Sequence, residues 1–390
     1  MKRSSILVIS FSNLAIDPRV NRQIRLLQKD HHVVAAGLAA PDVADVEFIL
    51  LPCRTKPLWQ RTGAALRLKL HRYLSYYWNI DSVRAAWDAL RSRSFDLIIA
   101  NDADTWPLAV ALQGPARLLF DAHEYAPREL EDLAHWRFFY QRYKHFLCRH
   151  YLPRAQAVTT VCAGIADEYA RMFAVRPEVV MNVPPWRDSV PVSVSHDRIR
   201  MIHHGAAARS RRIERMICAM DHLDARFQFD LMLVGSDASY LARLHDLAAT
   251  RPQVQFRPPV PMQRIPDETR DYDVGVFLLE PKNFNYLHAL PNKFFEFIQA
   301  RLTIAIGPSP EMARLVRKFD CGVVADDFSC ESLARALNAL TPATIERFKQ
   351  NAHKAAAVLC WDRESETLRR IVERLLDQPP IAVPATACLL

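Results

Sequence analysis

Glycine is scarce in this sequence. Its 390 residues include nine glycines, with no Gly-Gly pair and no two glycines separated by one residue. This spacing excludes the Walker loop and the dinucleotide fingerprint, because both need closely spaced glycines to bring the backbone near phosphate. A phosphate ligand would therefore have to be held by the start of a helix and by side chains.

Paired cysteines and long apolar runs are also missing. The eight cysteines contain no C-x-x-C pair, which argues against a zinc site or a disulfide framework and favours reduced thiols in a cytoplasmic protein. No run approaches the roughly 20 apolar residues of a membrane span. The apolar run Ile6–Ile9 is too short for a signal peptide, so we interpret it as a first strand.

Basic residues outnumber acidic ones, giving a formal net charge of +8 and an isoelectric point of about 9.1. This balance favours anionic partners, such as phosphorylated small molecules or an acidic membrane face. The sequence contains no recognised nucleic-acid-binding module, so we expect no nucleic-acid partner.

Short apolar segments alternate with helical ones in two series. The first contains "ILVIS", a helix that begins "DPRVNRQIRLL", and the strands "FDLIIAND" and "RLLFDAHEY"; we also expect a long helix over about 129–152. The proline-rich segment 183–197 interrupts the pattern, which restarts at "IRMIHHG". Two runs of strand–helix units predict an α/β protein with two doubly wound parallel sheets.

The segment "LPNKFFEFIQ" brings polar residues to the start of an otherwise apolar helix. Pro291 at a helix start leaves free backbone N–H groups and the positive end of the helix dipole, which stabilise an anion. Lys293 adds a full charge, and the Glu296 carboxylate can accept two hydrogen bonds from a ribose diol. A capped helix with surface charges explains the same pattern without a ligand.

"DAHEYAPRE" places three titratable side chains, Asp121, His123 and Glu124, where a strand ends. Such a group suits an active site, although an aspartate cap and a structural histidine are the alternative. The nearby Asp102 and Asp104 have the spacing of a metal-binding D-x-D pair. Two carboxylates alone hold a metal poorly, so we expect no metal and interpret them as strand-end caps or ligand contacts.

These segments together resemble the nucleotide-sugar glycosyltransferases of the GT-B fold, most of all the GT4-type bacterial enzymes. "LPNKFFEFIQARLTIAIGPSP" is similar to their PNK-x-x-E block, "HHGAAARSRRIERMICAM" to their HHG segment, and "DAHEYAPRE" to their D-x-H-E segment. The similarity covers most of residues 5–340. It implies two doubly wound, Rossmann-like domains facing across a cleft, and a nucleoside-diphosphate sugar as donor with no other cofactor.

The resemblance also implies roles for particular residues. The catalytic candidates are His123, close to the transferred sugar, with Glu124 and Asp121 orienting the sugar or the acceptor hydroxyl. The donor would be bound by His204, Gly205, Arg211, Pro291, Asn292, Lys293 and Glu296, with Arg209 as a substitute second cation. The first strand-to-helix turn would contact the acceptor through Asn13, Asp17 and Arg19. Asp17 can equally be explained as the N-cap of the helix that follows it.

The sequence departs from the family pattern at four positions. The family has glycine after its donor arginine and before the strand that follows the PNK helix, whereas this chain has Arg212 and Arg301. The family's second glutamate is replaced by His288, and the cation that often follows the HHG glycine is replaced by Ala206.

The expected organisation is an N-terminal acceptor-binding domain over 1–185, a C-terminal donor-binding domain over 186–361, a helix over 362–376 packing back on the N-terminal domain, and a tail over 377–390. The basic, aromatic segment 58–78 predicts one amphipathic helix, suited either to the inner membrane face or to a core. We therefore expect a cytoplasmic protein, or a peripheral one at the plasma membrane, with a glycan or polyprenyl-diphosphate-linked acceptor.

The resemblance implies that the anomeric configuration is retained, while inversion with Asp121 or Glu124 as general base stays open. Two other functions fit the same sequence. One is a nucleotide-sugar epimerase of the same fold, and the other is a non-catalytic subunit that binds a sugar nucleotide or a glycan.

Overall fold

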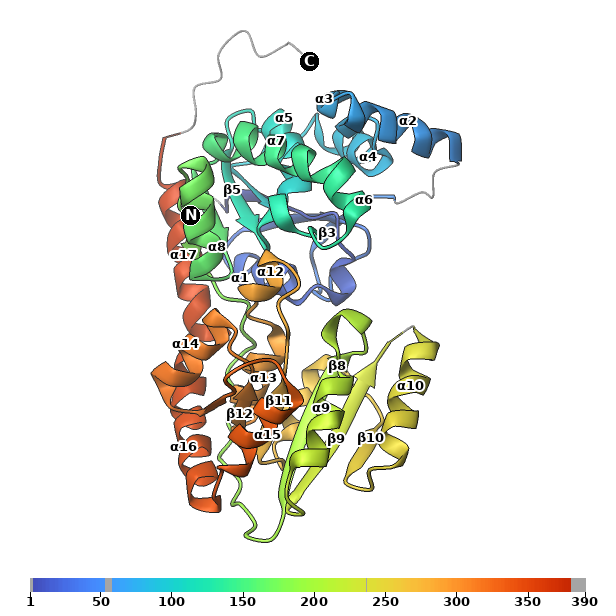
Figure 1. The fold of residues 1–390 in the computed structure, drawn as a ribbon. Helices are drawn as coiled ribbons and strands as arrows, with labels where there is room; N and C mark the ends of the chain where they lie inside the picture. The colour runs from blue at the N-terminus through green and yellow to red at the C-terminus, as the bar shows by residue number, and fades with distance from the viewer. Residues whose placement is uncertain (1–2, 53–57, 236, 380–390) are drawn as a thin grey trace. The chain divides into compact units, whose positions relative to one another are not determined.

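The computed structural model describes residues 3–52, 58–235 and 237–379, so most of the expected tail, 380–390, lies outside the described residues. The chain forms two compact units (Figure 1). The first consists of the residues up to Val180 and those from Ser365 onward, and the second is Met181–Glu364. No helix in the described part of the chain is long and apolar enough to cross a membrane.

The first unit contains a parallel sheet in the order β3-β2-β1-β4-β5-β6-β7. Its strands are β1 (Ser5–Ile9), β2 (His32–Gly37), β3 (Glu47–Leu50), β4 (Leu97–Asn101), β5 (Arg117–Ala122), β6 (Ala157–Thr160) and β7 (Glu178–Val179). The central strands are continuous apolar runs, because helices cover both faces of the sheet and leave neither to water. Ile6 pairs with Val33 on one side and with Leu97 on the other.

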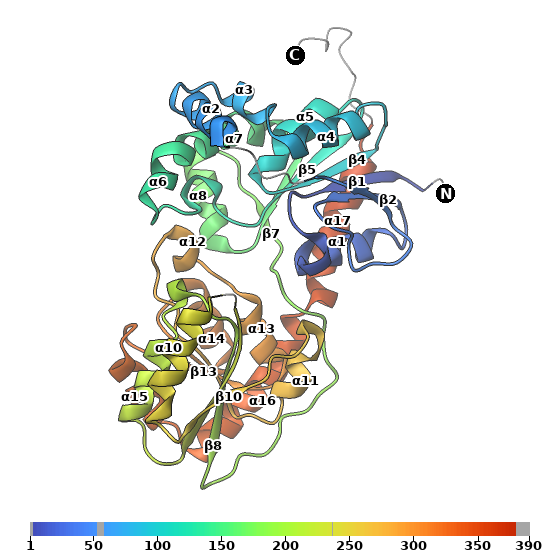
Figure 2. The ribbon, with the colours of Figure 1, turned by 90° about the vertical axis from the view of Figure 1, so that its right-hand side faces the viewer.

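The helices of the first unit lie on both faces of this sheet (Figure 2), with α4 and α5 on one side and α1 and α17 on the other. They are α1 (Pro18–Leu27), α2 (Leu58–Lys69), α3 (Tyr73–Tyr77), α4 (Asp81–Leu90), α5 (Trp106–Leu112), α6 (Ala134–Trp136), α7 (Arg142–Tyr151), α8 (Ala163–Phe173) and α17 (Trp361–Leu376). The part of α17 in this unit is tied to it by an ion pair between Arg374 and Glu178, 2.5 Å apart.

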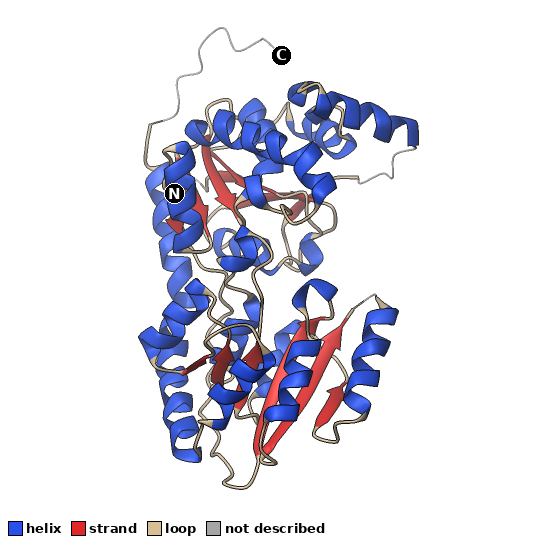
Figure 3. Cartoon of the chain, viewed as in Figure 1, coloured by secondary structure: helices blue, strands red, loops and turns tan. Residues whose placement is uncertain are grey.

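The second unit repeats the plan with the strand order β10-β9-β8-β11-β12-β13, coloured red in Figure 3. Its strands are β8 (Ile199–Ala206), β9 (Phe227–Val234), β10 (Val254–Arg257), β11 (Val274–Phe277), β12 (Thr303–Ile306) and β13 (Gly322–Val324). Its helices are α9 (Glu214–Ala219), α10 (Ala238–Ala249), α11 (Ile265–Thr269), α12 (Phe284–Leu287), α13 (Asn292–Gln299), α14 (Pro310–Phe319), α15 (Cys330–Asn338) and α16 (Pro342–Val358). The expectation of two doubly wound parallel sheets is confirmed.

Two helix predictions were wrong. The segment 58–78 is two helices, because His71 adopts a left-handed backbone (φ 55°) and the amide of Arg72 bonds back to the Arg67 carbonyl, which ends α2. The expected helix over 129–152 begins only at Ala134 and contains a π-helical turn, η4 (Arg137–Gln141), before α7. Neither break is marked by glycine or proline.

Candidate active site

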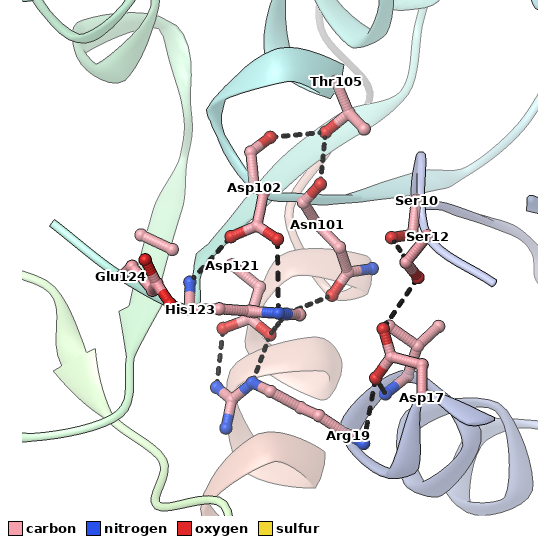
Figure 4. A network of polar contacts seen from close by, with 12 residues as sticks. Ser10, Ser12, Asp17, Arg19, Asn101, Asp102, Thr105, Asp121, His123 and Glu124 are labelled. Carbon is pink, nitrogen blue, oxygen red and sulfur yellow. Dashed lines mark hydrogen bonds and ion pairs between the residues drawn. The ribbon is translucent and has the colours of Figure 1, made fainter. Parts of the chain in front are cut away.

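Three of the predicted polar residues of the first unit, together with Asn101, meet where β4 and β5 end (Figure 4). Asn101 closes β4, Asp102 follows it, Asp121 lies within the end of β5, and His123 comes two residues later. The backbone N–H of His123 donates to the Asp102 carboxylate at 3.1 Å, which fixes the loop that carries the imidazole. The carboxyl ends of neighbouring parallel strands thus bring these side chains together, as expected for a doubly wound sheet.

Both nitrogens of His123 face acceptor oxygens. Nε2 lies 3.0 Å from Asp121 Oδ2 and 3.1 Å from Asn101 Oδ1, and Nδ1 lies 3.3 Å from Asp102 Oδ2. Burial alone would lower the pKa of His123, but the charges of Asp102 and Asp121 overcome it and raise that pKa to about 9. At neutral pH this histidine is therefore an imidazolium that donates on both sides, and it cannot serve as a general base.

Asp121 is buried and fully engaged. Its two carboxylate oxygens accept hydrogen bonds from Arg19 at 2.6 and 2.7 Å, from Gln23 at 2.6 Å and from Thr159 at 2.7 Å. Burial opposes its charge, yet Arg19 and His123 hold the pKa of Asp121 well below its usual value. A carboxylate with this many donors orients His123 and is poorly suited to take a proton from a substrate.

Asp102 has a backbone conformation that is rare for a residue with a side chain, with φ 64° and ψ 155°. Such strain costs about 1–3 kcal/mol and is concentrated at functional sites. Burial raises the pKa of Asp102, while His123 lowers it. The other aspartate of the pair, Asp104, bonds to Lys144 at 2.8 Å, so the two carboxylates have different partners and form no joint metal cage.

Glu124 lies at the edge of this cluster (Figure 4), and part of its side chain is exposed. Burial by neighbouring atoms and the negative charges of Glu129 and Asp102 raise the pKa of Glu124 to about 7. A carboxyl group that titrates near neutral pH can accept a proton in one step and donate it in the next. Among the described residues of this cluster, Glu124 is the best suited to move a proton.

The first strand-to-helix turn has mainly structural contacts. Asn13 caps the short 3₁₀ turn η1 (Leu14–Ile16), and Asp17 caps α1 by accepting from the amides of Arg19 and Val20. The Arg19 guanidinium is buried, where it pairs with Asp121 and donates to the Val180 carbonyl at 2.7 Å. These contacts leave Arg19 unavailable for the acceptor phosphate that the sequence suggested.

In the second unit, the predicted donor residues converge on Gly205 at the end of β8. A side-chain carbon at Gly205 would lie 3.1 Å from Lys293 Nζ and 3.6 Å from Arg211 Nη1, and the residue has φ 111°. Glycine is therefore required here by both space and backbone conformation. Arg211 and Lys293, 82 residues apart in the sequence, meet over this one position.

Lys293 is buried at the start of α13. Its ammonium donates to the His204 carbonyl at 2.5 Å and to His203 Nε2 at 3.2 Å, and it lies 4.5 Å above the Phe277 ring. Burial and the charge of Arg211 lower the pKa of Lys293 far below its usual value. His203, which our sequence interpretation missed, bonds through Nδ1 to the Val276 carbonyl at 2.9 Å and so presents Nε2 to the lysine.

Arg211 is the second cation of this site. Its one side-chain hydrogen bond among the described residues joins Nη1 to the Ala206 carbonyl at 3.4 Å. Burial lowers the pKa of Arg211. Neither Arg211 nor Lys293 forms an ion pair with a carboxylate in the part of the chain that the structure describes, and burial disfavours the charged form of both.

A cavity of about 430 Å³ opens beside these cations. Its polar side is lined by His204, Gly205, Ala206, Arg211, Pro291, Asn292, Lys293 and Glu296. Its apolar side is lined by Met232, Val234, Pro259, Val260, Met262 and Ile265, which come from the end of β9 and from the segment between β10 and the start of α11. The neutral ring of His204 lies 3.5 Å from the Glu296 carboxylate, since burial and two nearby cations lower the pKa of His204.

Other predicted or divergent residues lie elsewhere. Arg209 pairs with Asp237 at 2.8 Å and is not among the cavity-lining residues. Arg212 and Arg301, which stand where the family has glycine, both adopt left-handed backbones, with φ 46° and 64°. The Arg301 guanidinium is buried and donates to backbone carbonyls, including that of Arg187 at 2.5 Å.

One group in the described residues has the ligand types and spacing to hold a metal. The ligand atoms of His222, Cys330 and Glu331 lie within 4.8 Å of one another. None of the three lines the cavity around Lys293 or belongs to the His123 cluster. The two clusters described above therefore contain no set of metal ligands of this kind.

Part of the chain matches the model of a known family. Residues 16–186 match the model of the glycosyl transferase 4-like domain. The chain carries this domain and is a glycosyltransferase. A search of curated protein sequences gives no match.

Several solved structures share the fold of this glycosyltransferase. Sucrose-phosphate synthase from Thermosynechococcus elongatus has 15% identity and a TM-score of 0.71, over 96% of this chain and 99% of that one. HepE from Anabaena, solved with UDP-glucose, has 13% identity and a TM-score of 0.71, over 95% and 100%. WaaG, described as a glycosyltransferase involved in lipopolysaccharide biosynthesis, has 12% identity and a TM-score of 0.67, over 94% and 99%. These likenesses confirm the predicted GT-B fold.

Two features of the second unit's cavity were not predicted from the sequence. We predicted His204 as a donor-binding residue and did not predict a role for His203. Side chains alternate between the two faces of β8, so only one of two adjacent histidines can point its ring at Lys293, and that residue is His203. The apolar side of the cavity is built from three separate segments with no common motif. A systematic listing of the residues that follow each strand would have found Val234 and Pro259.

Proposed function

We propose that this protein transfers a sugar from a nucleoside-diphosphate sugar to a glycan or lipid-linked acceptor in the synthesis of a cell-surface polysaccharide or glycolipid. The observation that carries the proposal is the pair of basic side chains over Gly205, the buried Lys293 and the half-buried Arg211. Lys293 and Arg211 lack a carboxylate partner among the described residues, and an anion between them would restore their charges. A diphosphate suits two cations and the start of α13.

The rest of the cavity fits the remaining parts of a nucleotide. Its apolar side, with Val234, Val260 and Met262, can hold a base, and Glu296 can accept hydrogen bonds from a ribose diol. The Anabaena HepE structure contains UDP-glucose, which supports a donor of this class. Asn292 and Pro291, at the start of the same helix, complete the side that would face the phosphates.

The proposed reaction joins an acceptor hydroxyl oxygen to the anomeric carbon and breaks the bond from that carbon to the donor's diphosphate. With retention, the hydroxyl proton passes to the departing phosphate on the same face. With inversion, the Glu124 carboxylate takes it, which its pKa of about 7 permits. Asp121 is no longer a candidate base because its oxygens are occupied.

A membrane-facing role of the 58–78 region remains part of the proposal. Figures 1 and 2 show α2 and α3 beside α7, and in α2, α3 and the turn between them Leu66, Leu70 and Leu74 are 56%, 55% and 49% exposed. The same segment, the neighbouring turn η4 and the start of α7 carry the exposed basic residues Lys69, Arg72, Arg137 and Arg142. Exposed apolar side chains together with basic ones suit an anionic lipid surface.

A lipid-binding test can use matched variants. The triple variant Leu66→Ser, Leu70→Ser, Leu74→Ser should float less with vesicles that contain anionic lipid than the wild-type protein does. Serine substitutions at the exposed Trp186, Val190 and Val358 of the second unit, which do not line the donor cavity, provide the control. Equal flotation of the wild type and the leucine variant would rule out this surface as the membrane contact.

The donor assignment is tested by a thermal-shift screen of UDP-, GDP-, ADP-, CDP- and dTDP-sugars, because a ligand that binds only the folded state raises the melting temperature. We expect at least one to stabilise the wild-type protein and none to stabilise Arg211→Gln to the same degree. If the screen gives no shift, or equal shifts for both proteins, the assignment fails.

Turnover then separates the enzyme from its two alternatives. Transfer rates are measured with the stabilising donor and lipid-linked or glycan acceptors. If the enzyme inverts, Glu124→Gln should lower the rate and remove the change of rate with pH near 7. If it retains, both the rate and its pH dependence should stay as in the wild type. An altered sugar formed without any acceptor would favour the epimerase. Donor binding with no turnover under any condition would favour the non-catalytic subunit.

A further inference from the structure

A second cavity, of about 320 Å³, lies within the first unit. It is lined by Phe11, Tyr76, Ile80, Ser82, Asp104, Glu129, Trp136, Tyr140, Tyr143 and Lys144. Phe11 follows β1, and Asp104 lies just after β4, so the cavity opens at the same edge of the sheet as His123. Asp104 is two residues from Asp102, which contacts His123, and this spacing brings the cavity next to the candidate catalytic cluster.

Half of its lining residues are aromatic. Tyr76 meets Tyr143 edge-to-face, with ring centroids 5.1 Å apart, and Tyr140 at 6.5 Å. Tyr140 belongs to the π-helical turn η4, and such turns occur often at functional sites. Rings held by one another in this way offer flat apolar faces to a ligand, as the C–H face of a sugar ring requires.

The charges in the cavity argue against an anionic ligand. Lys144 lies 2.8 Å from Asp104 and 2.9 Å from Glu129, so one ammonium faces two carboxylates and the group is net negative. This is the reverse of the cavity around Lys293, where cations lack such partners. Carboxylate oxygens with free lone pairs accept hydrogen bonds from hydroxyl groups, whereas a phosphate would be repelled.

One polar atom of the cavity lacks a partner. Tyr143 is 2% exposed, and its hydroxyl forms no hydrogen bond with any described residue. Buried hydroxyl groups are nearly always paired, with protein, water or ligand. A ligand hydroxyl in this cavity would provide the missing partner.

We propose that this cavity binds a neutral, hydroxyl-rich sugar residue of the acceptor, and not its phosphate or lipid part. The aromatic faces would pack on the ring, Asp104 and Glu129 would accept from its hydroxyl groups, and the Tyr143 hydroxyl would bond to one of them. The inference rests on the proposed transfer of a sugar to a glycan acceptor. It moves the acceptor contacts from the first turn, where Asp17 and Arg19 are occupied, to this cavity.

Saturation-transfer NMR on the full-length protein tests the proposal, with methyl glucoside, galactoside, mannoside and N-acetylglucosaminide as probes and glucose 1-phosphate as the anionic counterpart. At least one methyl glycoside should bind the wild-type protein. Tyr140→Ala should abolish that signal, and Tyr143→Phe should weaken binding about five- to tenfold through one lost hydrogen bond. Phe138→Ala and Tyr151→Phe, which alter aromatic residues outside the lining, should leave it unchanged.

The outcomes separate this inference from the proposed function. Binding of no methyl glycoside, equal binding to Tyr140→Ala, or tighter binding of glucose 1-phosphate at this cavity would overturn the inference. Nucleotide-sugar binding measured on the same samples reports on the donor site independently. If glycosides bind as described but no nucleotide sugar does, the proposed function fails and the sugar-binding cavity stands.

Discussion

The cations at the two candidate sites are compensated in opposite ways. Around His123 each is neutralised within the protein: Arg19 by Asp121, His123 by Asp102 and Asp121, and Lys144 by Asp104 and Glu129. At the cavity of the second unit, the buried Lys293 and the half-buried Arg211 form no ion pair with a carboxylate among the described residues. The pKa of His123 is accordingly raised and those of Lys293 and Arg211 are lowered.

This difference separates a framework from a binding site. Charges that are satisfied internally hold side chains in fixed positions, whether or not a ligand is present. Charges that are left unsatisfied cost stability in the free protein, and that cost is recovered when an anion binds. The first unit thus positions His123, while the cavity of the second unit would gain stability from the diphosphate that we propose as its ligand.

The largest effect is expected from breaking the framework. Asp121→Asn leaves Arg19 buried without its counter-charge, and removing one partner of a buried pair costs about 3–5 kcal/mol. Chemical unfolding followed by circular dichroism should show this loss for the first unit. Asp42→Asn, at the exposed pair with Arg25, is the control and should change stability by less than about 1 kcal/mol. Similar losses for the two variants would contradict the account.

The pH dependence of stability should identify His123. Its pKa rises from 6.5 to about 9 on folding, which corresponds to about 3 kcal/mol at roughly 1.4 kcal/mol per pKa unit. Because the folded pKa is the higher one, this stabilisation is complete below pH 6.5 and is lost as the pH rises through about 9. The difference in unfolding free energy between wild type and His123→Gln should shrink over that interval. A difference that stays constant would show that His123 is not the group that titrates.

Substituting one lysine in each unit should give opposite signs. Lys144→Met leaves Asp104 and Glu129 facing each other and should cost about 2 kcal/mol of stability. Lys293→Met replaces a buried amine, whose charged form burial disfavours, with an apolar side chain and should raise the stability of the ligand-free protein by about 1 kcal/mol. Thermal unfolding of the two variants beside wild type measures both. Loss of stability in both would mean that Lys293 is compensated after all.

The sequence predicted the fold well because parallel strands buried on both faces read as continuous apolar runs, as "LIIAN" of β4 does. The family resemblance also predicted that Lys293 and Arg211 would lie in one site, because it assigned both residues to the binding of the donor. The sequence did not predict the end of α2, because His71 adopts a left-handed backbone that non-glycine residues rarely take. The pairing of Arg19 with Asp121 was also missed, since 102 residues separate them and neither residue type distinguishes a buried pair from two ligand contacts.

The Lys293 cavity can be tested most directly by the protons it takes up. A diphosphate that restores the charge of Lys293 must raise its pKa, so binding should draw protons from the buffer. Calorimetric titration of the stabilising nucleoside diphosphate in buffers of different ionisation enthalpy measures that uptake. We expect net uptake for the wild type that disappears in Lys293→Met, together with a loss of affinity of about tenfold or more. Binding without proton uptake, or equal uptake by Lys293→Met, would contradict the claim that this lysine holds the diphosphate.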